Sequence, residues 1–307
     1  MNAHTSIVLA GSSGFIGTEL EKRLLSEGYS VTRLTRHVDP NHSSASAVTQ
    51  VAWDPSRGHI DQTVIDSADA VINLAGANIS GKRWDRISKK EILKSRIDAT
   101  RTIVNAINRS STPPSVLLSA SATGYYGYPM GPVDESSPAG STFLADVCVD
   151  WERSAIGALG SGTRVAFLRT GIVMSPRGGA LKKLLLPLKL GFGGPLGSGE
   201  QVWSWISLED EIRAICFVLE HRSAWGPVNL VAPHPASNRA ITDELGRVLK
   251  RPTRMRVPQP VLRLVLGQFS QEITQSVTVK PTVLEALGFN FSHPTVTDMA
   301  QWVACKE

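Results

Sequence analysis

Short runs of apolar residues alternate, over the first 170 positions, with longer segments whose apolar residues recur with helical spacing. A short apolar run predicts a buried strand, and the longer spacing predicts a helix that covers a core with one face. The expected strands cover residues 6–10, 29–35, 48–53, 68–75, 115–119 and 165–169, and the expected helices cover 15–26, 86–108 and 144–159. Repeated units of this kind predict an α/β fold, a Rossmann-type doubly wound parallel sheet.

The chain changes character after Thr170. Glycine and proline become frequent, as in 191–199, and strands and helices alternate less regularly. We therefore expect residues 1–170 to form the Rossmann domain. Residues 171–307 are expected to form a smaller substrate lobe with a C-terminal helical tail from about Pro258, although later segments can return to the sheet.

A glycine-rich loop joins the first expected strand to the first expected helix. Its residues are expected to bind the cofactor: Gly11, Ser12, Ser13, Gly14, Phe15, Ile16 and Gly17. Glycine permits a tight turn, close approach of a pyrophosphate and close packing of helix on strand, and the helix N-terminus offers free N–H groups. The spacing is G-x-x-G-x-x-G, not the G-x-G-x-x-G of many dehydrogenases. A turn without a ligand is the alternative, and the strand before and helix after favour a dinucleotide.

The end of the second strand favours NADP(H) over NAD(H). NAD-binding proteins usually place an acidic residue there to accept a hydrogen bond from the ribose 2′-hydroxyl. This strand instead ends Arg33-Leu-Thr-Arg36, and Arg36 offers a guanidinium suited to a 2′-phosphate. The alternative is an ordinary surface arginine, and Arg33 is open to either interpretation.

Two further strand ends fit the same cleft. Trp53 and Asp54 end the third strand, where the aspartate can accept from the adenine amino group. Leu74, Ala75 and Gly76 follow the fourth, where a small backbone can pass close to the cofactor. A plain turn is the alternative at both places.

Several motifs together resemble one protein family. They are Gly11–Gly17, Asn73–Gly76, Lys82–Trp84, Ser95–Ile97, Ser119–Tyr126, Trp151-Glu152, Gly193–Gly199, Trp205-Ile206 and a C-terminal segment from Pro260 to Phe289. The chain is similar along its whole length to the atypical extended short-chain dehydrogenase/reductases called epimerase family proteins, also labelled nucleoside-diphosphate-sugar epimerase-like proteins or cell-division inhibitors. The resemblance implies a seven-stranded parallel sheet, NADP(H) binding and no settled substrate.

The catalytic dyad of the wider superfamily is missing. Its reductases place Tyr and Lys four residues apart on one helix, where the Lys cation and the nicotinamide ribose lower the pKa of the Tyr phenol. Tyr-x-x-x-Lys occurs nowhere in this chain. Counted back from Trp151-Glu152, the two positions hold Leu144 and Cys148, which cannot perform that chemistry.

Substitutes for the dyad are expected after the fifth strand. The resemblance implies that Ser121 or Thr123 hydrogen-bonds a substrate hydroxyl, and Tyr125 or Tyr126 can supply a phenol as acid. The alternative is that both tyrosines pack between the two lobes.

Three more residues are expected around the same cleft. Ser119 and Arg169 are expected at the cofactor, with Arg169 at its nicotinamide end, and Trp205 is expected in the substrate pocket. Trp205 can equally be a core aromatic.

Composition and charge argue against several classes of protein. The hydrophobic fraction of 42% supports a core, the charged fraction of 19% is too low for disorder, and the net charge of +5 is mild. The lysines and arginines of residues 82–96 are expected to form the solvated face of a helix. Arg96 is expected to point toward the cofactor. Nucleic acid is not expected as a partner.

Residues 76–83 resemble the P-loop motif of nucleoside triphosphatases. Arg83, however, occupies the position where that motif needs Ser or Thr to bind Mg²⁺.

The remaining expectations are negative or general. No apolar run approaches the roughly 20 residues of a membrane span, and the N-terminus lacks a basic signal-peptide region. The three cysteines form no close pair, and the seven histidines show no metal-binding spacing, so no metal is expected. We expect a cytoplasmic monomer or homodimer. It is either an NADP(H)-dependent oxidoreductase or epimerase for a small carbonyl or sugar-like substrate, or a catalytically silent NADP(H)-binding sensor or scaffold.

Overall fold

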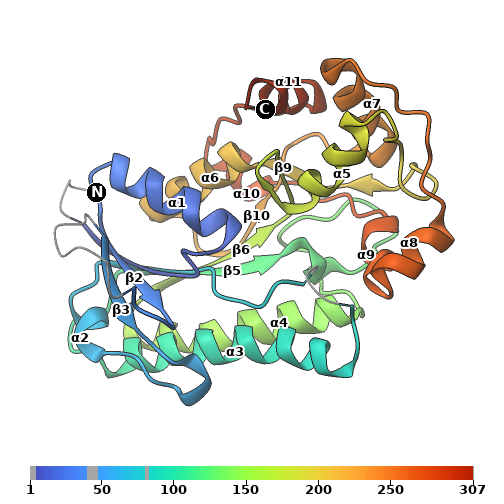
Figure 1. Ribbon diagram of the computed structural model, residues 1–307. Coiled ribbons are helices and arrows are strands. Elements are labelled where there is room, and N and C mark those ends of the chain that lie inside the picture. Colours follow the sequence, from blue (N-terminus) through green and yellow to red (C-terminus); the bar gives the residue numbers. More distant parts are fainter. Residues whose placement is uncertain (1–4, 40–47, 80–82, 307) are drawn as a thin grey trace.

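A seven-stranded parallel sheet with helices on both faces forms the centre of the protein (Figure 1). The structure is a computed structural model that describes residues 5–39, 48–79 and 83–306, so Gly81 and Lys82 of the motifs above lie outside it. The strand order is β10-β6-β5-β4-β1-β2-β3. The order reverses between β1 and β4, which is the switch point of a doubly wound fold.

The strands are short and mostly buried on both sides, which explains their continuous apolar runs. Their bounds are β1 (Ser6–Ala10), β2 (Ser30–Thr35), β3 (Val48–Ala52), β4 (Ala70–Asn73), β5 (Val116–Ala122), β6 (Arg164–Thr170) and β10 (Gly226–Leu230). Ile7 and Leu9 of β1 belong to one hydrophobic core, whereas Val8 and Ala10 belong to another. Alternate residues of a strand point to opposite faces, so β1, β2, β4, β5 and β6 each contribute side chains to both cores.

Helices form a layer on each face of the sheet. On one face α3 (Arg86–Arg109) packs against α4 (Phe143–Ile156), and on the other α1 (Phe15–Ser26) packs against α6 (Leu208–Glu220) (Figure 1). The short α2 (Gln62–Asp66) precedes β4. None of the helices among the described residues is long and apolar enough to cross a membrane.

A smaller lobe lies beside the carboxyl ends of β5 and β6 (Figure 1). Its core contains Met174, Trp203, Trp205 and Met299. The elements of the lobe are β7 (Ile172–Ser175), α5 (Gly179–Lys189), β8 (Val202–Trp203), β9 (Trp205–Ser207), β11 (Ala236–Ser237), α7 (Asn238–Leu249), α8 (Gln259–Leu266), α9 (Phe269–Thr274) and α11 (Val296–Lys306). Helix α10 (Thr282–Ala286) instead packs against β10, with Leu284 in the core of the sheet.

The predicted α/β class and the Rossmann-type sheet are confirmed. Two details of the sheet differ from those predicted by the apolar pattern. A seventh strand, β10, returns to the sheet from the second half of the chain and pairs with β6. Residues 171–307 therefore contribute both to the sheet and to the smaller lobe. The fifth strand runs on to Ala122, which places Ser121 within the sheet.

Candidate functional site

The glycine loop makes a tight turn against the end of β4. The Gly14 N–H donates to the Gly11 carbonyl over 3.0 Å, and Gly11 has a φ of 84°. A Cβ at Gly11 would lie 2.6 Å from the Leu74 carbonyl carbon and 2.9 Å from the Ala75 nitrogen. Only glycine combines that φ with so close a neighbour. Leu74 and Ala75, predicted to lie beside the cofactor, are therefore next to the loop.

Helix α1 packs closely on the same turn. A Cβ at Gly17 would lie 2.2 Å from the Gly11 carbonyl oxygen, so any side chain there would displace the loop. Phe15 packs its ring against Gly178 and Gly179, and Ile16 joins the core beneath the sheet. The first turn of α1 thus contacts the smaller lobe as well as β1.

The N-terminus of α1 is free to bind an anion. Side chains of Asp85, Thr142 and Ser207 cap α3, α4 and α6, whereas Gly14 caps α1 without a side-chain hydrogen bond. The first turn of α1 also contains no acidic residue. Ser12 is buried and Ser13 is exposed. Uncapped N–H groups at the positive end of a helix dipole are suited to phosphate oxygens.

The two arginines of β2 have different surroundings. Arg33 donates through Nε and Nη2 to both carboxylate oxygens of Glu21, the former over 2.9 Å. Arg36 is exposed and has no hydrogen-bond or ion-pair partner among the described residues. Its guanidinium is available for a ligand at the end of β2, whereas that of Arg33 is engaged.

The two residues that follow β3, Trp53 and Asp54, both have structural roles. The Asp54 carboxylate accepts from the backbone N–H and the hydroxyl of Ser56 and so caps a short 3-10 helix. Trp53 is buried in the core between the sheet and α3. Both residues have structural roles here, and their predicted contact with adenine stays a prediction.

Arg96 of α3 reaches the end of β4. Its Nη1 donates to the Ala77 carbonyl over 3.1 Å and to the Ile92 carbonyl over 2.9 Å. A Cβ at Gly76 would lie 3.1 Å from the Arg96 Cζ, so glycine leaves room for the guanidinium. Burial lowers the pKa of Arg96. The structure thus brings Arg96 and Gly76 together beside the Gly11 loop.

A buried ion pair lies behind the end of β5. The Glu152 carboxylate accepts from Arg169 Nε and Nη2, both over 2.9 Å, and from the Ser121 hydroxyl over 2.6 Å. All three side chains are buried. Ser121 therefore donates its proton to a structural partner, and the guanidinium of Arg169 is already paired. The buried hydroxyl of Ser119 has no partner among the described residues.

The adjacent tyrosines Tyr125 and Tyr126 differ in their hydrogen bonds. The Tyr126 hydroxyl donates to Asn229 Oδ1 over 2.7 Å and accepts from Arg169 Nη1 over 2.9 Å. Burial raises the pKa of Tyr126 to about 12. The Tyr125 ring lies 3.5 Å from the Arg169 guanidinium, and its hydroxyl has no hydrogen-bond partner among the described residues. Tyr126 is thus fixed to Asn229 of β10 and Arg169 of β6, whereas the described residues leave the Tyr125 phenol without a hydrogen bond.

The positions of the missing dyad face the end of β5. A Cβ at Gly124 would lie 3.2 Å from Leu144 Cβ and 4.0 Å from Cys148 Sγ. The Cys148 thiol donates to the Ala122 carbonyl over 3.7 Å, and burial raises its pKa to about 12. Position 148, predicted from the sequence to be that of the dyad lysine, holds a buried thiol.

The remaining predicted residues are Thr123 and Trp205. Thr123 is half-buried at the start of the 3-10 helix after β5. Trp205 is fully buried in the core of the smaller lobe, and its indole N–H has no partner among the described residues. A role of Trp205 in a substrate pocket stays a prediction.

Three buried polar residues were not predicted to act at the site: Glu152, Asn229 and Glu211. Glu152 lies four residues after Cys148 and so on the same side of α4, which was a usable signal. Glu211 of α6 accepts from the Thr170 hydroxyl over 2.8 Å, and burial raises its pKa to about 8. Nothing in the sequence connects Asn229 with Tyr126, because the pairing is made only by folding.

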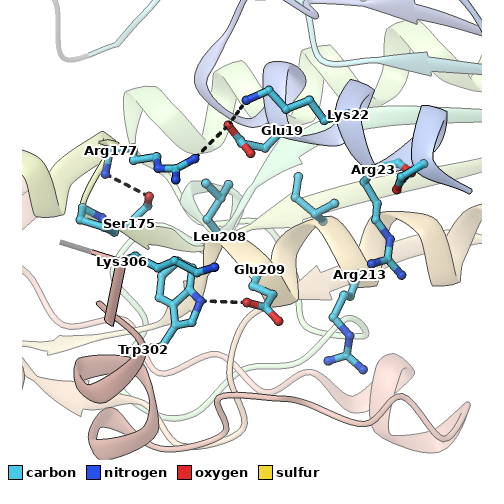
Figure 2. A pocket seen from close by; sticks show the side chains of 13 residues that line it. Glu19, Lys22, Arg23, Ser175, Arg177, Leu208, Glu209, Arg213, Trp302 and Lys306 are labelled. Carbon is cyan, nitrogen blue, oxygen red and sulfur yellow. Dashed lines mark hydrogen bonds and ion pairs between the residues drawn. The ribbon is translucent and has the colours of Figure 1, made fainter. Parts of the chain in front are cut away.

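A separate cavity of about 450 Å³ lies between α1, α6 and α11 (Figure 2). The Trp302 indole donates to Glu209 over 2.8 Å, and Glu19 lies 2.8 Å from Lys22 Nζ. The cavity shares no lining residue with the Gly11 loop. Within the described ranges, no group of three or more His, Cys, Asp or Glu side chains is arranged to hold a metal ion.

The fold and the loop define a Rossmann-type protein of the extended short-chain dehydrogenase/reductase kind. The chain belongs to the NAD dependent epimerase/dehydratase family, whose model matches residues 7–230. A domain of unknown function (DUF1731) matches residues 257–303.

The relatives span nearly the whole chain. Epimerase family protein Mb2239 of Mycobacterium bovis is 38% identical over 96% of each chain. The chloroplastic SDR39U1 homolog of Arabidopsis thaliana is 36% identical over 95% of this chain and 85% of that protein. Human epimerase family protein SDR39U1, whose crystal structure contains NADPH, has a sequence 30% identical to this one. The two structures superpose with a TM-score of 0.90, and the match covers 99% of this chain and 100% of the human one.

Proposed function

We propose that this protein binds NADP(H) across the Gly11 loop, with the pyrophosphate at the N-terminus of α1 and the 2′-phosphate at Arg36. The free N-terminus of α1, next to the end of β4, is the observation that carries the proposal. Arg36 is exposed and has no partner among the described residues, which supports the phosphorylated cofactor. The human relative crystallised with NADPH supports the same choice.

The reaction we propose is hydride transfer, as in an oxidoreductase or epimerase, on a small carbonyl or sugar-like substrate. The bound cofactor supplies or accepts the hydride. Thr123 and Tyr125 remain as candidates at the end of β5, because Ser121 and Tyr126 are held in the buried network. The free phenol of Tyr125 exchanges a proton with the substrate oxygen, and the Thr123 hydroxyl hydrogen-bonds the same group.

A second candidate function is an NADP(H)-binding sensor or scaffold without turnover. One observation favours it: Leu144 and Cys148 occupy the dyad positions, and the Cys148 thiol is buried. A cytoplasmic location is part of either proposal, and one relative is named as chloroplastic.

A binding titration followed by a turnover screen tests the proposal. Purified protein is titrated with NADPH and with NADH, and we expect NADPH to bind more tightly by a factor of roughly 10 to 100, the worth of a charge-assisted contact. Arg36→Ala should remove this preference, whereas Arg153→Ala, at a side chain that is 72% exposed, should keep it. Equal dissociation constants for NADPH and NADH contradict the Arg36 assignment.

NADPH absorbance is then followed with a panel of carbonyl compounds and nucleotide sugars. Turnover that is lost in Tyr125→Phe supports the enzyme. Tight NADPH binding without turnover across the panel supports the sensor.

A further inference from the structure

The Arg96 guanidinium is held between three elements of the fold and keeps open hydrogen-bond donors. It comes from α3, it lies at the end of β4, and its guanidinium is packed 4.9 Å from the centre of the Trp151 ring on α4. A guanidinium has five N–H donors. Two of them bond to the carbonyls of Ala77 and Ile92, and the other three have no partner among the described residues. None of those three is sealed from solvent.

No described residue neutralises the charge of Arg96. The groups that face it are the Ala77 carbonyl from the loop, the Ile92 carbonyl from α3, and the Trp151 ring and Cys148 thiol from α4. No carboxylate of the described residues pairs with it. A partly buried cation without an anion is costly, and its open Nε and Nη2 donors find no acceptor in the described part of the chain.

This charge lies against the part of α4 where the dyad lysine is expected. Cys148 holds the dyad lysine position on α4, and Trp151, which stacks on Arg96, lies one helical turn further on. Burial raises the pKa of the Cys148 thiol, and the Arg96 charge lowers it by a smaller effect. A positive charge is thus kept beside position 148, although it comes from another helix.

The sheet also fixes which half of a dinucleotide Arg96 would meet. A doubly wound sheet consists of two mononucleotide-binding halves that meet at the switch point. Arg36 ends β2 on the β1-β2-β3 side, which takes the adenosine half. Arg96 lies at the end of β4 on the other side, which takes the nicotinamide half.

We propose that Arg96 supplies from α3 the positive charge that a dyad lysine would supply from α4, and that it binds the nicotinamide-side ribose of NADP(H). This inference rests on the proposed binding of NADP(H). The open Nε and Nη2 donors hydrogen-bond the ribose hydroxyls, and the charge favours a deprotonated oxygen next to them. Arg96 thereby fixes the nicotinamide half of the cofactor independently of the 2′-phosphate contact.

Two nucleotides that differ by the nicotinamide half test this assignment. The dissociation constants of NADPH and of adenosine 2′,5′-bisphosphate, which lacks that half, are measured on the wild type, Arg96→Met, Arg96→Lys and Arg101→Met. Arg101 is an exposed arginine on the same helix and serves as the matched control. The thermal midpoint of each variant is recorded first, and Arg96→Lys serves if Arg96→Met does not fold.

We expect Arg96→Met to weaken NADPH by roughly 10- to 100-fold and to leave adenosine 2′,5′-bisphosphate within about twofold. Arg96→Lys should retain part of the NADPH affinity, and Arg101→Met all of it. Unchanged NADPH affinity in Arg96→Met overturns the inference, and so does an equal loss for both nucleotides. A wild type that binds neither nucleotide instead overturns the proposed function.

Discussion

The buried ion pair of Glu152 and Arg169 makes the stability of this protein sensitive to one carboxylate. The two side chains are 9% and 4% exposed, and two hydrogen bonds of 2.9 Å join them. Burial alone lowers the pKa of Arg169, but the hydrogen bonds and charge of Glu152 outweigh it and raise the pKa overall. Arg169 is therefore a permanent cation whose burial depends on Glu152.

Replacing Glu152 by glutamine keeps the volume and removes the charge. Breaking a buried pair by removing one partner costs about 3–5 kcal/mol, because the remaining charge is left uncompensated. For a chain of about 300 residues this corresponds to a fall of roughly 5–8 °C in the midpoint of thermal unfolding. The Ser121 hydroxyl also loses its charged acceptor, which adds to the effect.

Urea denaturation and a thermal scan of Glu152→Gln measure this cost. Glu200→Gln is the matched control, since that carboxylate is 73% exposed and its pair with Arg239 is on the surface; we expect a change within about 0.5 kcal/mol. The double variant Glu152→Leu/Arg169→Met should be more stable than either single substitution. A loss of less than about 1 kcal/mol in Glu152→Gln refutes the reasoning.

Three further predictions concern the loop, the tyrosines and Glu211. Gly17→Ala should weaken NADPH at least about 10-fold, because its Cβ would lie 2.2 Å from the Gly11 oxygen; unchanged affinity contradicts this. Tyr126→Phe should cost about 1–3 kcal/mol of unfolding free energy, since Asn229 loses a buried donor, whereas Tyr125→Phe should cost almost nothing. Between pH 4.5 and about 8 the folded protein keeps a proton on Glu211 that the unfolded chain releases, so stability falls as pH rises. Glu211→Gln should flatten this slope, and an unaltered slope in urea titrations at pH 5 and pH 8 would show that Glu211 is not its source.

Local chemistry explains why much of the fold was predictable. The apolar runs of β1 and β4 are buried on both faces, and α1 and α3 begin where the sequence predicts. The strand β10 was missed because Gly226 and Pro227 interrupt its short apolar run, and only the family resemblance implied a seventh strand.

The site was less predictable, because its polar side chains are paired by folding. Ser121 and Tyr126 have the residue types expected of catalysis, but their partners Glu152 and Asn229 lie 31 and 103 positions away. The sequence left Arg33 open to the same interpretation as Arg36, and the ion pair of Arg33 with Glu21 separates the two. Glycine loops are predictable because their requirement is a local backbone conformation.

A crystal structure of the protein with NADP⁺ tests the central claim most directly. We predict pyrophosphate oxygens at the N–H groups of the first turn of α1, the 2′-phosphate within hydrogen-bond distance of Arg36, and the nicotinamide-side ribose at Arg96. A dinucleotide bound away from the Gly11 loop contradicts the account, as does one whose 2′-phosphate and nicotinamide-side ribose touch neither arginine.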